Sequence, residues 1–194
     1  VQFVAPRWCA NFGVSQNGRL VFEPGGAGRQ RQLTWFDLDG KELSQVGVPA
    51  NMAGFSLSPD GTRAVASQSP AQGGAQELWL YELSRGVASR FSFSKKGTLA
   101  PRWSPDGRQV AFGELGGGVS VKPADGTAEP KKVWASDATG WPLSWSPDGK
   151  QIVYEWFADQ IEVRVVGIDG SEPRVLYSSG DVQLLLIHEW APDG

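Results

Sequence analysis

Length, composition and charge exclude several classes of protein before any motif is considered. The chain has 194 residues, 40% of them hydrophobic and 20% charged, as expected for a globular protein with its own core. A formal net charge of −3 gives no basic surface for nucleic acid, and no apolar run is long enough to span a membrane. Cys9 is the single cysteine, which excludes an internal disulfide.

Taken in chain order, the predicted elements are short strands, because β-branched and aromatic residues gather in brief runs bounded by turn-forming residues. The clearest runs are Leu20–Glu23, Leu33–Asp37, Ala64–Ser67, Leu78–Glu82, Gln109–Gly113, Val119–Lys122, Lys131–Ala135, Ile152–Glu155 and Val163–Ile168. No longer segment has a helical period, so the sequence predicts an all-β fold.

A four-residue turn sequence recurs between these runs. Its three full copies are Ser58-Pro59-Asp60-Gly61, Ser104-Pro105-Asp106-Gly107 and Ser146-Pro147-Asp148-Gly149. Related copies start at Ser15 and Ala191, and the five starts are 43, 46, 42 and 45 residues apart. A second turn marker keeps the same period and consists of Asp39-Gly40, Arg85-Gly86, Asp125-Gly126 and Asp169-Gly170. Two markers in phase indicate a tandem repeat.

Each residue type of this turn has a physical reason for its position. Serine bonds back to the backbone, proline fixes φ, aspartate suits the third position, and glycine accepts a left-handed conformation. We therefore interpret all twelve residues of the three full copies as structural turn residues that close a hairpin between two strands. A metal site formed by Asp60, Asp106 and Asp148 is disfavoured, because these residues recur a whole unit apart.

Four-stranded units of this period are typical of a β-propeller, in which each unit is one antiparallel blade. We expect repeats at about 1–47, 48–94, 95–136 and 137–180, with an incomplete fifth at 181–194. Four complete blades plus the first strand of a fifth suggest a piece of a larger ring. The recurring tryptophans are expected to pack blade against blade, and Trp8 and Trp141 are candidates for stacking on a ligand because they lie in loop-like contexts.

The turn sequence, preceded by an aromatic residue and followed by a short apolar strand, resembles the WD-like repeat of TolB-type propellers. The order of the segments VSQNGRLVF, RQLTWFDLDGKELSQVG, LSPDGTRAVA, LWLYELSRGVASRFSF and APRWSPDGRQVAFG is similar to the C-terminal propeller of bacterial, eukaryotic-like serine/threonine protein kinases. The resemblance implies a propeller attached to a kinase domain and a periplasmic or extracytoplasmic location. The sequence itself does not separate that location from the cytoplasm.

The sequence contains few residues that would indicate catalysis or phosphate binding. The kinase glycine-rich loop, H-R-D loop and D-F-G motif are missing, and so is the G-x-S-x-G elbow of serine peptidases that carry a similar propeller. His188 is the single histidine and is interpreted as a strand residue. The glycine runs at 25–28 and 116–118 are followed by no helix, so they are read as hairpin loops rather than phosphate sites.

The sequence therefore predicts a non-catalytic interaction or sensor module. We expect no catalytic, cofactor-binding or metal-binding residues, no nucleic-acid partner and no direct membrane contact. A protein, peptide or small ligand would bind through loops that join the blades, such as Val48–Gly54, Ser94–Ala100 and Ser136–Pro142. Three alternatives stay open: the regulatory part of a serine/threonine kinase, the propeller of a prolyl-oligopeptidase-like peptidase, and a purely structural spacer.

Overall fold

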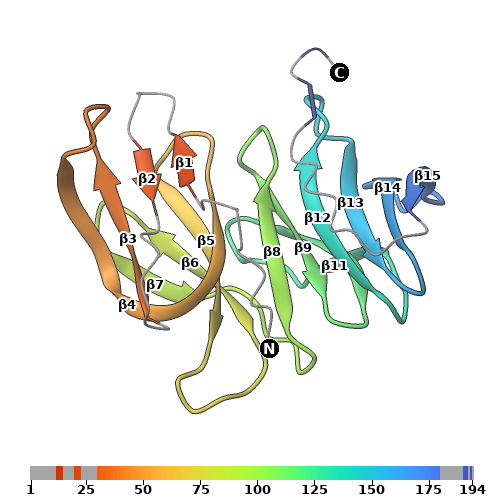
Figure 1. Cartoon of the computed structure of the whole chain (residues 1–194), viewed down its shortest axis with the longest axis horizontal. Coiled ribbons are helices and arrows are strands. Elements are labelled where there is room, and N and C mark those ends of the chain that lie inside the picture. Colours follow the sequence, from red (N-terminus) through yellow and green to blue (C-terminus); the bar gives the residue numbers. More distant parts are fainter. Residues whose placement is uncertain (1–11, 15–19, 23–29, 180–189, 192, 194) are drawn as a thin grey trace, which may run out of the picture.

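The computed structural model describes residues 12–14, 20–22, 30–179, 190, 191 and 193, and within them every regular element is a β-strand (Figure 1). The strands are β1 (Phe12–Val14), β2 (Leu20–Phe22), β3 (Arg31–Phe36), β4 (Glu42–Leu57), β5 (Arg63–Ser69), β6 (Glu77–Glu82), β7 (Val87–Arg90), β8 (Thr98–Trp103), β9 (Gln109–Glu114), β10 (Gly118–Pro123), β11 (Lys131–Trp134), β12 (Thr139–Trp145), β13 (Gln151–Phe157), β14 (Ile161–Gly167) and β15 (Arg174–Ser179). The all-β prediction is confirmed for this part of the chain.

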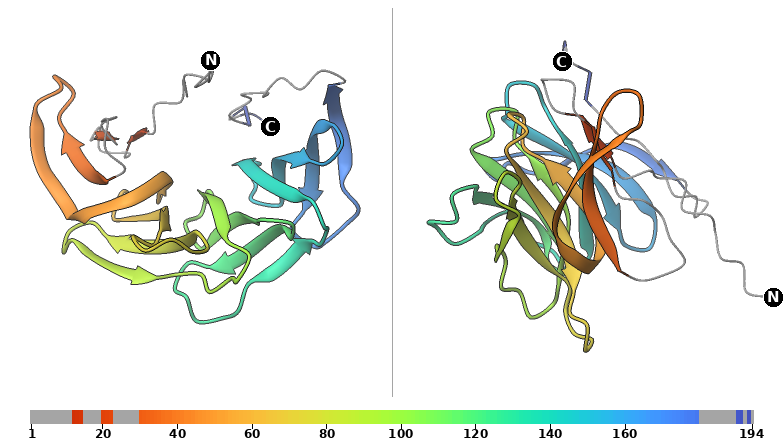
Figure 2. Two further views of the ribbon diagram at one scale, coloured as in Figure 1. Left: turned by 60° about the horizontal axis from the view of Figure 1, so that its bottom comes forward. Right: turned by 90° about the vertical axis from the view of Figure 1, so that its left-hand side faces the viewer.

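Consecutive strands pair antiparallel and form four blades side by side along an arc, as Figure 2 shows. The first blade consists of β1, β2, β3 and residues 42–50 of β4, and the second of residues 51–57 of β4 with β5, β6 and β7. The third blade is β8 to β11 and the fourth is β12 to β15. The predicted propeller architecture of four-stranded blades is therefore confirmed.

Two features connect the blades through the backbone. The long strand β4 pairs with β3 along its first part and with β5 along its second, so the first two blades share one hydrogen-bonded sheet. The third and fourth blades meet where Gly118 of β10 pairs parallel with Thr139 of β12. The unit boundaries drawn from the sequence stay a prediction, because β4 runs without a break across the first of them. The residues 181–189, 192 and 194 of the expected fifth unit lie outside the described residues.

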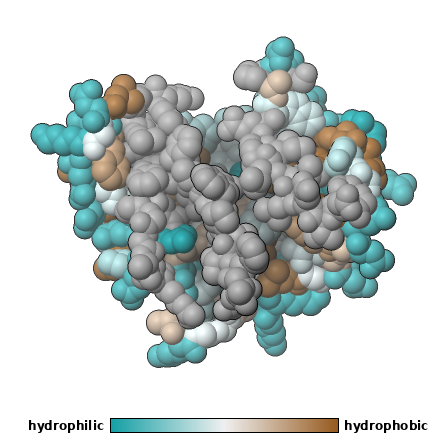
Figure 3. Space-filling model, in the orientation of Figure 1, coloured by the Kyte–Doolittle hydropathy of each residue, from teal (hydrophilic) through white to brown (hydrophobic). Residues whose placement is uncertain are grey.

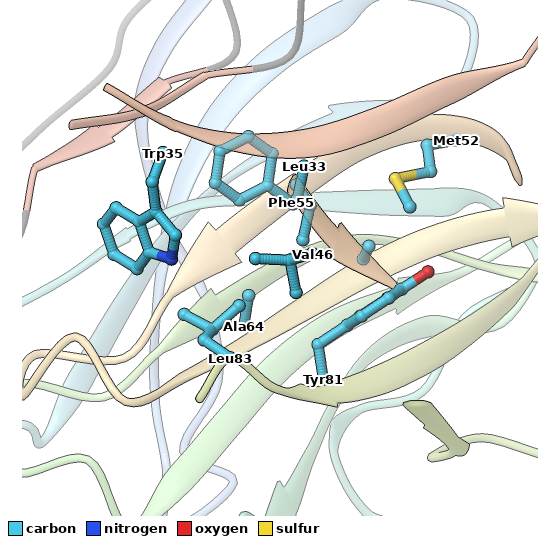
Figure 4. Close-up of a cluster of buried hydrophobic side chains, with 9 residues drawn as sticks. Leu33, Trp35, Val46, Met52, Phe55, Ala64, Tyr81 and Leu83 are labelled. Atoms are coloured by element: carbon cyan, nitrogen blue, oxygen red, sulfur yellow. The ribbon is translucent and has the colours of Figure 1, made fainter. Parts of the chain in front are cut away.

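Among the described residues, three hydrophobic clusters lie between consecutive blades, and a fourth, with Leu143 and Val153, lies on the outer face of the fourth blade. Side chains alternate between the two faces of a strand, so one strand contributes to two clusters. In β5, Ala64 and Ala66 join the cluster shared with the first blade, which Figure 4 shows in close-up, whereas Val65 joins the cluster shared with the third blade. In β9, Ala111 faces the fourth blade while its neighbour Val110 faces the second. Each inner blade is thus buried on both faces.

The antiparallel order also fixes which hairpins lie together. In a four-stranded blade, the hairpin joining the first and second strands lies at the same end as the one joining the third and fourth. The three full copies of the turn sequence join β4 to β5, β8 to β9 and β12 to β13. We call this end of the blades, with the turns at 58–61, 104–107 and 146–149 and the hairpins at 124–130 and 168–173, the turn face.

Candidate functional site

The repeated turn has the same hydrogen bonds in all three full copies. The Ser58 hydroxyl donates to Asp60 Oδ1 at 2.6 Å and accepts from the backbone N–H of Arg63 at 2.9 Å, and the backbone N–H of Thr62 reaches the same carboxylate oxygen at 3.0 Å. The equivalent bonds start from Ser104 and Ser146, with distances that agree closely. Gly61 closes the turn at φ +68°, in the left-handed region that favours glycine.

These bonds decide the charge state of the turn aspartates. The hydrogen bond from Ser104, with that from the backbone N–H of Arg108, holds the pKa of Asp106 below its usual value. The bonds from Ser146 and from the backbone of Lys150 do the same for Asp148. Both carboxylates are therefore anionic near neutral pH, with one oxygen committed to the turn. Within the described part of the chain, no group of three or more His, Cys, Asp or Glu side chains is arranged to hold a metal ion.

Tryptophans directly before two of the turns connect the third and fourth blades to the preceding ones. The Trp103 indole N–H donates to Ser56 O at 3.0 Å, and the Trp145 indole N–H donates to Arg102 O at 3.0 Å. Ser56 and Arg102 occupy the same place, two residues before a turn serine. The backbone N–H of Trp190 donates to Ser144 Oγ at 3.2 Å, as that of Trp103 does to Ser56 Oγ. The indole bonds recur from blade to blade and fix the spacing of the turns.

Between the second and third blades, an arginine fills the space behind the turns. Arg63 lies on β5, and its guanidinium carbon is 4.8 Å from the centre of the Trp103 ring. The same guanidinium donates to Ala124 O at 3.1 Å and approaches Gly107 O at 3.5 Å. One side chain thus spans from its own blade to a turn and a hairpin of the next. We call this space the blade 2–3 crevice.

Between the third and fourth blades, the equivalent space is open. Gln109 takes the place of Arg63, since each is the second residue after the turn glycine and starts the second strand of its blade. A hollow of about 340 Å³ lies there, bounded by Gln109, Ile168 and the two turns that contain Asp106 and Asp148. A second hollow of about 330 Å³ shares Gln109 and Ile168 with the first and extends along the hairpin 124–130. We call the two together the blade 3–4 groove.

A lysine closes part of this groove from the outer side. Lys131, on β11, lines the second hollow, and its Nζ donates to Ile168 O at 2.9 Å. Ile168 is the counterpart of Ala124, because each lies two residues before the glycine of the second turn marker. Arg63 therefore donates to the Ala124 carbonyl in the blade 2–3 crevice, whereas Lys131 donates to the equivalent Ile168 carbonyl in the blade 3–4 groove. Among the described residues that line the first hollow, Arg108 is the positively charged one.

A second polar feature lies on the outer face of the fourth blade. Glu155 on β13 is 5% exposed, and its Oε1 has no hydrogen-bond partner among the residues that the structure describes. Burial raises the pKa of this carboxyl to about 7. Trp141 pairs with Glu155 across the strands, is 40% exposed, and lies 6.0 Å from the Phe157 ring between centroids. The candidate stacking residue Trp141 is thus half-covered by its own blade.

The loops expected to carry the function are shorter than predicted. The segment Val48–Gly54 is wrong as a loop, because it lies inside β4, where the strand passes from one blade to the next. Ser94–Ala100 and Ser136–Pro142 each end inside a strand, β8 and β12 respectively. Cys9, Trp8, His188 and the glycines at 25–28 lie outside the described residues, whereas the glycines at 116–118 join β9 to β10 as expected.

Sequence reasoning missed the position shared by Arg63 and Gln109. The signal was present, since each residue is the second after its turn glycine, but only a comparison of the copies residue by residue reveals it. Glu155 was missed because an acidic residue inside an apolar strand gives no sign of whether its side chain is buried. Its equivalents in the second and third blades are Ser67 and Gly113.

The blades, their turn sequence and their inter-blade contacts define the class: the chain has a TolB-type β-propeller fold. It is similar to a TolB-type protein from Agrobacterium tumefaciens, at 18% identity and a TM-score of 0.70 over 87% of this chain and 64% of that one. It is also similar to TolB from Acinetobacter baumannii, at 19% identity and a TM-score of 0.67 over 88% of this chain and 43% of that one. The tricorn protease matches at 14% identity and a TM-score of 0.65, over 88% of this chain and 17% of that one.

Sequence comparison adds one short match. The chain is 38% identical over 58 residues to the "Uncharacterized peptidase YuxL" of Bacillus subtilis (strain 168), which is 28% of this chain and 9% of that protein. The chain therefore spans less than two thirds of the length of each of these proteins. No family model matches the sequence. Among the described residues, no helix is long and apolar enough to cross a membrane.

Proposed function

We propose that the chain is a non-catalytic interaction module that binds a segment of a protein or peptide on the turn face of its blades. The blade 3–4 groove is the observation that carries this proposal. It combines two adjoining hollows of about 340 and 330 Å³, and so offers an elongated site rather than a single small pocket. Its walls belong to hairpins held by the strands of two blades, which is a rigid frame for recognition.

The chemistry of the groove supports binding rather than catalysis. Asp106 and Asp148 are its carboxylates near the turns, and both are anchored by turn hydrogen bonds that keep them ionised. Neither has a shifted pKa of the kind that a general acid or base needs near neutral pH. Gln109, at the centre of the groove, neither ionises nor acts as a nucleophile. These residues are suited to holding a ligand by charge and hydrogen bonds.

The exposed hydrophobic residues that the structure describes are spread over several strands and loops. On the face seen in Figure 3, the hydrophobic residues among those coloured form separate patches, and hydrophilic residues occupy most of the rim. A partner that docks on this face through one broad apolar surface would need a continuous patch. A groove with polar walls and a few apolar contacts is the better match to a peptide segment.

A displayed library of short random peptides, selected against the intact chain, tests this function. We expect enriched peptides that compete with one another and that cross-link to residues of the turn face, as located by mass spectrometry. A selection that yields no peptide above background would contradict the proposal. Peptides that cross-link only to the opposite end of the blades would contradict the choice of site while preserving the function.

The alternative is the propeller part of a serine peptidase, favoured by the 58-residue match to the peptidase-named protein of Bacillus subtilis. Coding sequence downstream that contains a G-x-S-x-G elbow would support it. The association with a serine/threonine kinase, and the periplasmic or extracytoplasmic location, remain hypotheses from the sequence resemblance. A kinase domain encoded upstream would support the first, and an alkaline phosphatase fusion that is active outside the cytoplasm would support the second.

A further inference from the structure

The blade 2–3 crevice provides a template for what fits behind two adjacent turns. Its occupant is the guanidinium of Arg63, which stacks on Trp103 and donates to the carbonyls of Ala124 and Gly107. An aromatic face and carbonyl oxygens suit a planar cation with several N–H donors better than they suit a compact ammonium. This crevice is therefore a guanidinium site whose ligand happens to be part of the chain.

The blade 3–4 groove repeats part of the walls of this site, the turn and the hairpin end, without the arginine. Trp145 has the sequence position of Trp103, since both lie directly before a turn serine and donate their indole N–H to the preceding blade, but the residues that line the two hollows do not include it. Gly149 and Ile168 are the counterparts of Gly107 and Ala124, and both line the groove. Gln109 occupies the position equivalent to Arg63, but its side chain is shorter and carries no charge. The hollow of about 340 Å³ is what remains.

Two carboxylates give this hollow a local attraction for a cation. Asp106 and Asp148 line it, and hydrogen bonds lower the pKa of each, so both are ionised. Arg108 lines it as well, and Lys150 Nζ lies 3.8 Å from Asp148 at the solvent-exposed rim. Lys131 lines the second hollow, where its Nζ donates a hydrogen bond to Ile168 O. The described residues that line the first hollow sum to one net negative charge, and Lys150 at its rim offsets that charge, so the two carboxylates attract a guanidinium locally rather than through the net charge.

We propose that the blade 3–4 groove binds an arginine side chain presented by a partner peptide. The guanidinium enters the first hollow between the turns of Asp106 and Asp148 and takes the place that Arg63 takes one blade earlier. The flanking residues of the peptide lie along the second hollow, past Lys131. The inference deepens the proposed function, because it concerns the same groove and adds the identity of the side chain that is recognised.

The test uses nuclear magnetic resonance of the intact chain, with the indole N–H signals of Trp103 and Trp145 as reporters. N-acetyl-arginine N-methylamide is the probe, and its citrulline analogue is the neutral control of nearly the same shape. We expect a saturable shift of the Trp145 signal with the arginine probe, and binding weakened by about tenfold or more with citrulline. Equal binding of the two probes, or a response confined to other residues, would overturn the proposal.

Exchanging the two residues provides matched variants. In Gln109→Arg, the chain supplies its own guanidinium, so we expect the Trp145 response to the probe to be lost by about tenfold or more. In Arg63→Gln, the blade 2–3 crevice is vacated, so we expect a second response, at Trp103, with an affinity similar to the first. Binding that persists unchanged in Gln109→Arg contradicts the proposal, and this variant decides the question even if Arg63→Gln does not fold.

The outcome separates this inference from the proposed function. If library peptides bind the groove and the enriched sequences carry no arginine, the inference fails and the interaction module stands. If the arginine probe binds at Trp145 but no library peptide is enriched, the guanidinium site stands and the peptide-binding function fails.

Discussion

The blade 2–3 crevice and the blade 3–4 groove are built from the same turns, the same tryptophans and the same hairpin ends, yet one is filled and the other is open. One difference lies at the start of the second strand, where β5 begins with Arg63 and β9 begins with Gln109, and another is Lys131, which donates to Ile168 O in the groove. The repeat fixes the backbone, so that a change of one side chain alters the surface without altering the fold. In a propeller, a ligand site can thus arise by removing an internal contact between blades.

The largest expected effect tests whether the tryptophans hold both interfaces equally. Trp103→Ala and Trp145→Ala each remove a buried indole and its bond to the preceding blade, so we expect each to lower the free energy of unfolding by about 3–5 kcal/mol. Trp103→Ala should cost about 1 kcal/mol more, because Arg63 loses the ring on which it stacks. Urea denaturation followed by circular dichroism measures both values.

Phenylalanine at either position is the control for that experiment. It keeps an aromatic ring but loses the indole hydrogen bond and part of the ring volume, so a loss of about 1–2 kcal/mol is expected. If Trp145→Ala unfolded as readily as Trp103→Ala or more so, the stacked arginine would contribute nothing and the contrast between the interfaces would disappear.

The next effect concerns a second position that differs between the interfaces. Gly113 faces the fourth blade, and a Cβ added there would lie 2.0 Å from Gly140 O, a backbone atom that has little room to move. We expect Gly113→Ala to destabilise the chain by about 3 kcal/mol. Its equivalent in the second blade is Ser67, a buried serine whose hydroxyl has no hydrogen-bond partner in the described part of the chain, so Ser67→Ala should be neutral or slightly stabilising. Thermal unfolding of the two variants side by side would show this asymmetry, and similar melting temperatures would contradict it.

Glu155 extends the same comparison to the outer face of the fourth blade. Its folded pKa is raised by burial from 4.5 to about 7, so the folded state binds a proton that the unfolded state releases between these values. The folded chain is therefore favoured below pH 4.5, and this contribution is lost as the pH rises through 7. We expect Glu155→Gln to remove this loss, and to be more stable than the parent at pH 8 by roughly 1–2 kcal/mol once partial solvent screening is allowed for.

The measurement is the difference in unfolding free energy between Glu155→Gln and the parent from pH 4 to pH 8. All other titrating groups are common to the two proteins and cancel in the difference. A difference that does not change with pH would mean that the carboxyl titrates normally and is solvated in the folded state.

The local turns and the longer-range strand pairing were predictable from the sequence to different degrees. The turns could be predicted because each residue of Ser104-Pro105-Asp106-Gly107 has a local reason for its place, and local reasons need no knowledge of distant contacts. The blades followed from the period of these turns and from the strand residues between them. The continuous strand β4 could not be predicted, because the segment 48–54 contains a proline and a glycine, which usually interrupt strands, and only pairing with two blades keeps it extended.

The groove depends on distances between blades, which the sequence does not encode locally. Gln109 resembles any polar residue at the start of a strand until its neighbours in the fourth blade are known. The repeat offers a partial substitute for those neighbours. Aligning Gln109 with Arg63 shows where a side chain is exchanged, and the contacts of Arg63 show what the exchange removes.

The smallest expected effect measures how much an arginine contributes to each interface. Arg63→Gln loses the stacking on Trp103 and two carbonyl contacts at a half-exposed site, so we expect a loss of about 1 kcal/mol. Gln109→Arg should recover less than that, roughly half, because Lys131 already donates to Ile168 O and repels a second cation there.

This difference between the two interfaces has a specific cause, Lys131, and can be removed by mutation. When Lys131→Ala is combined with Gln109→Arg, the arginine should gain the full contribution seen at Arg63, and a double-mutant cycle measures the coupling between the two positions. A coupling of zero would mean that the two cations do not share the space behind the turns, and that the blade 3–4 groove is shaped by something other than the exchange at Gln109.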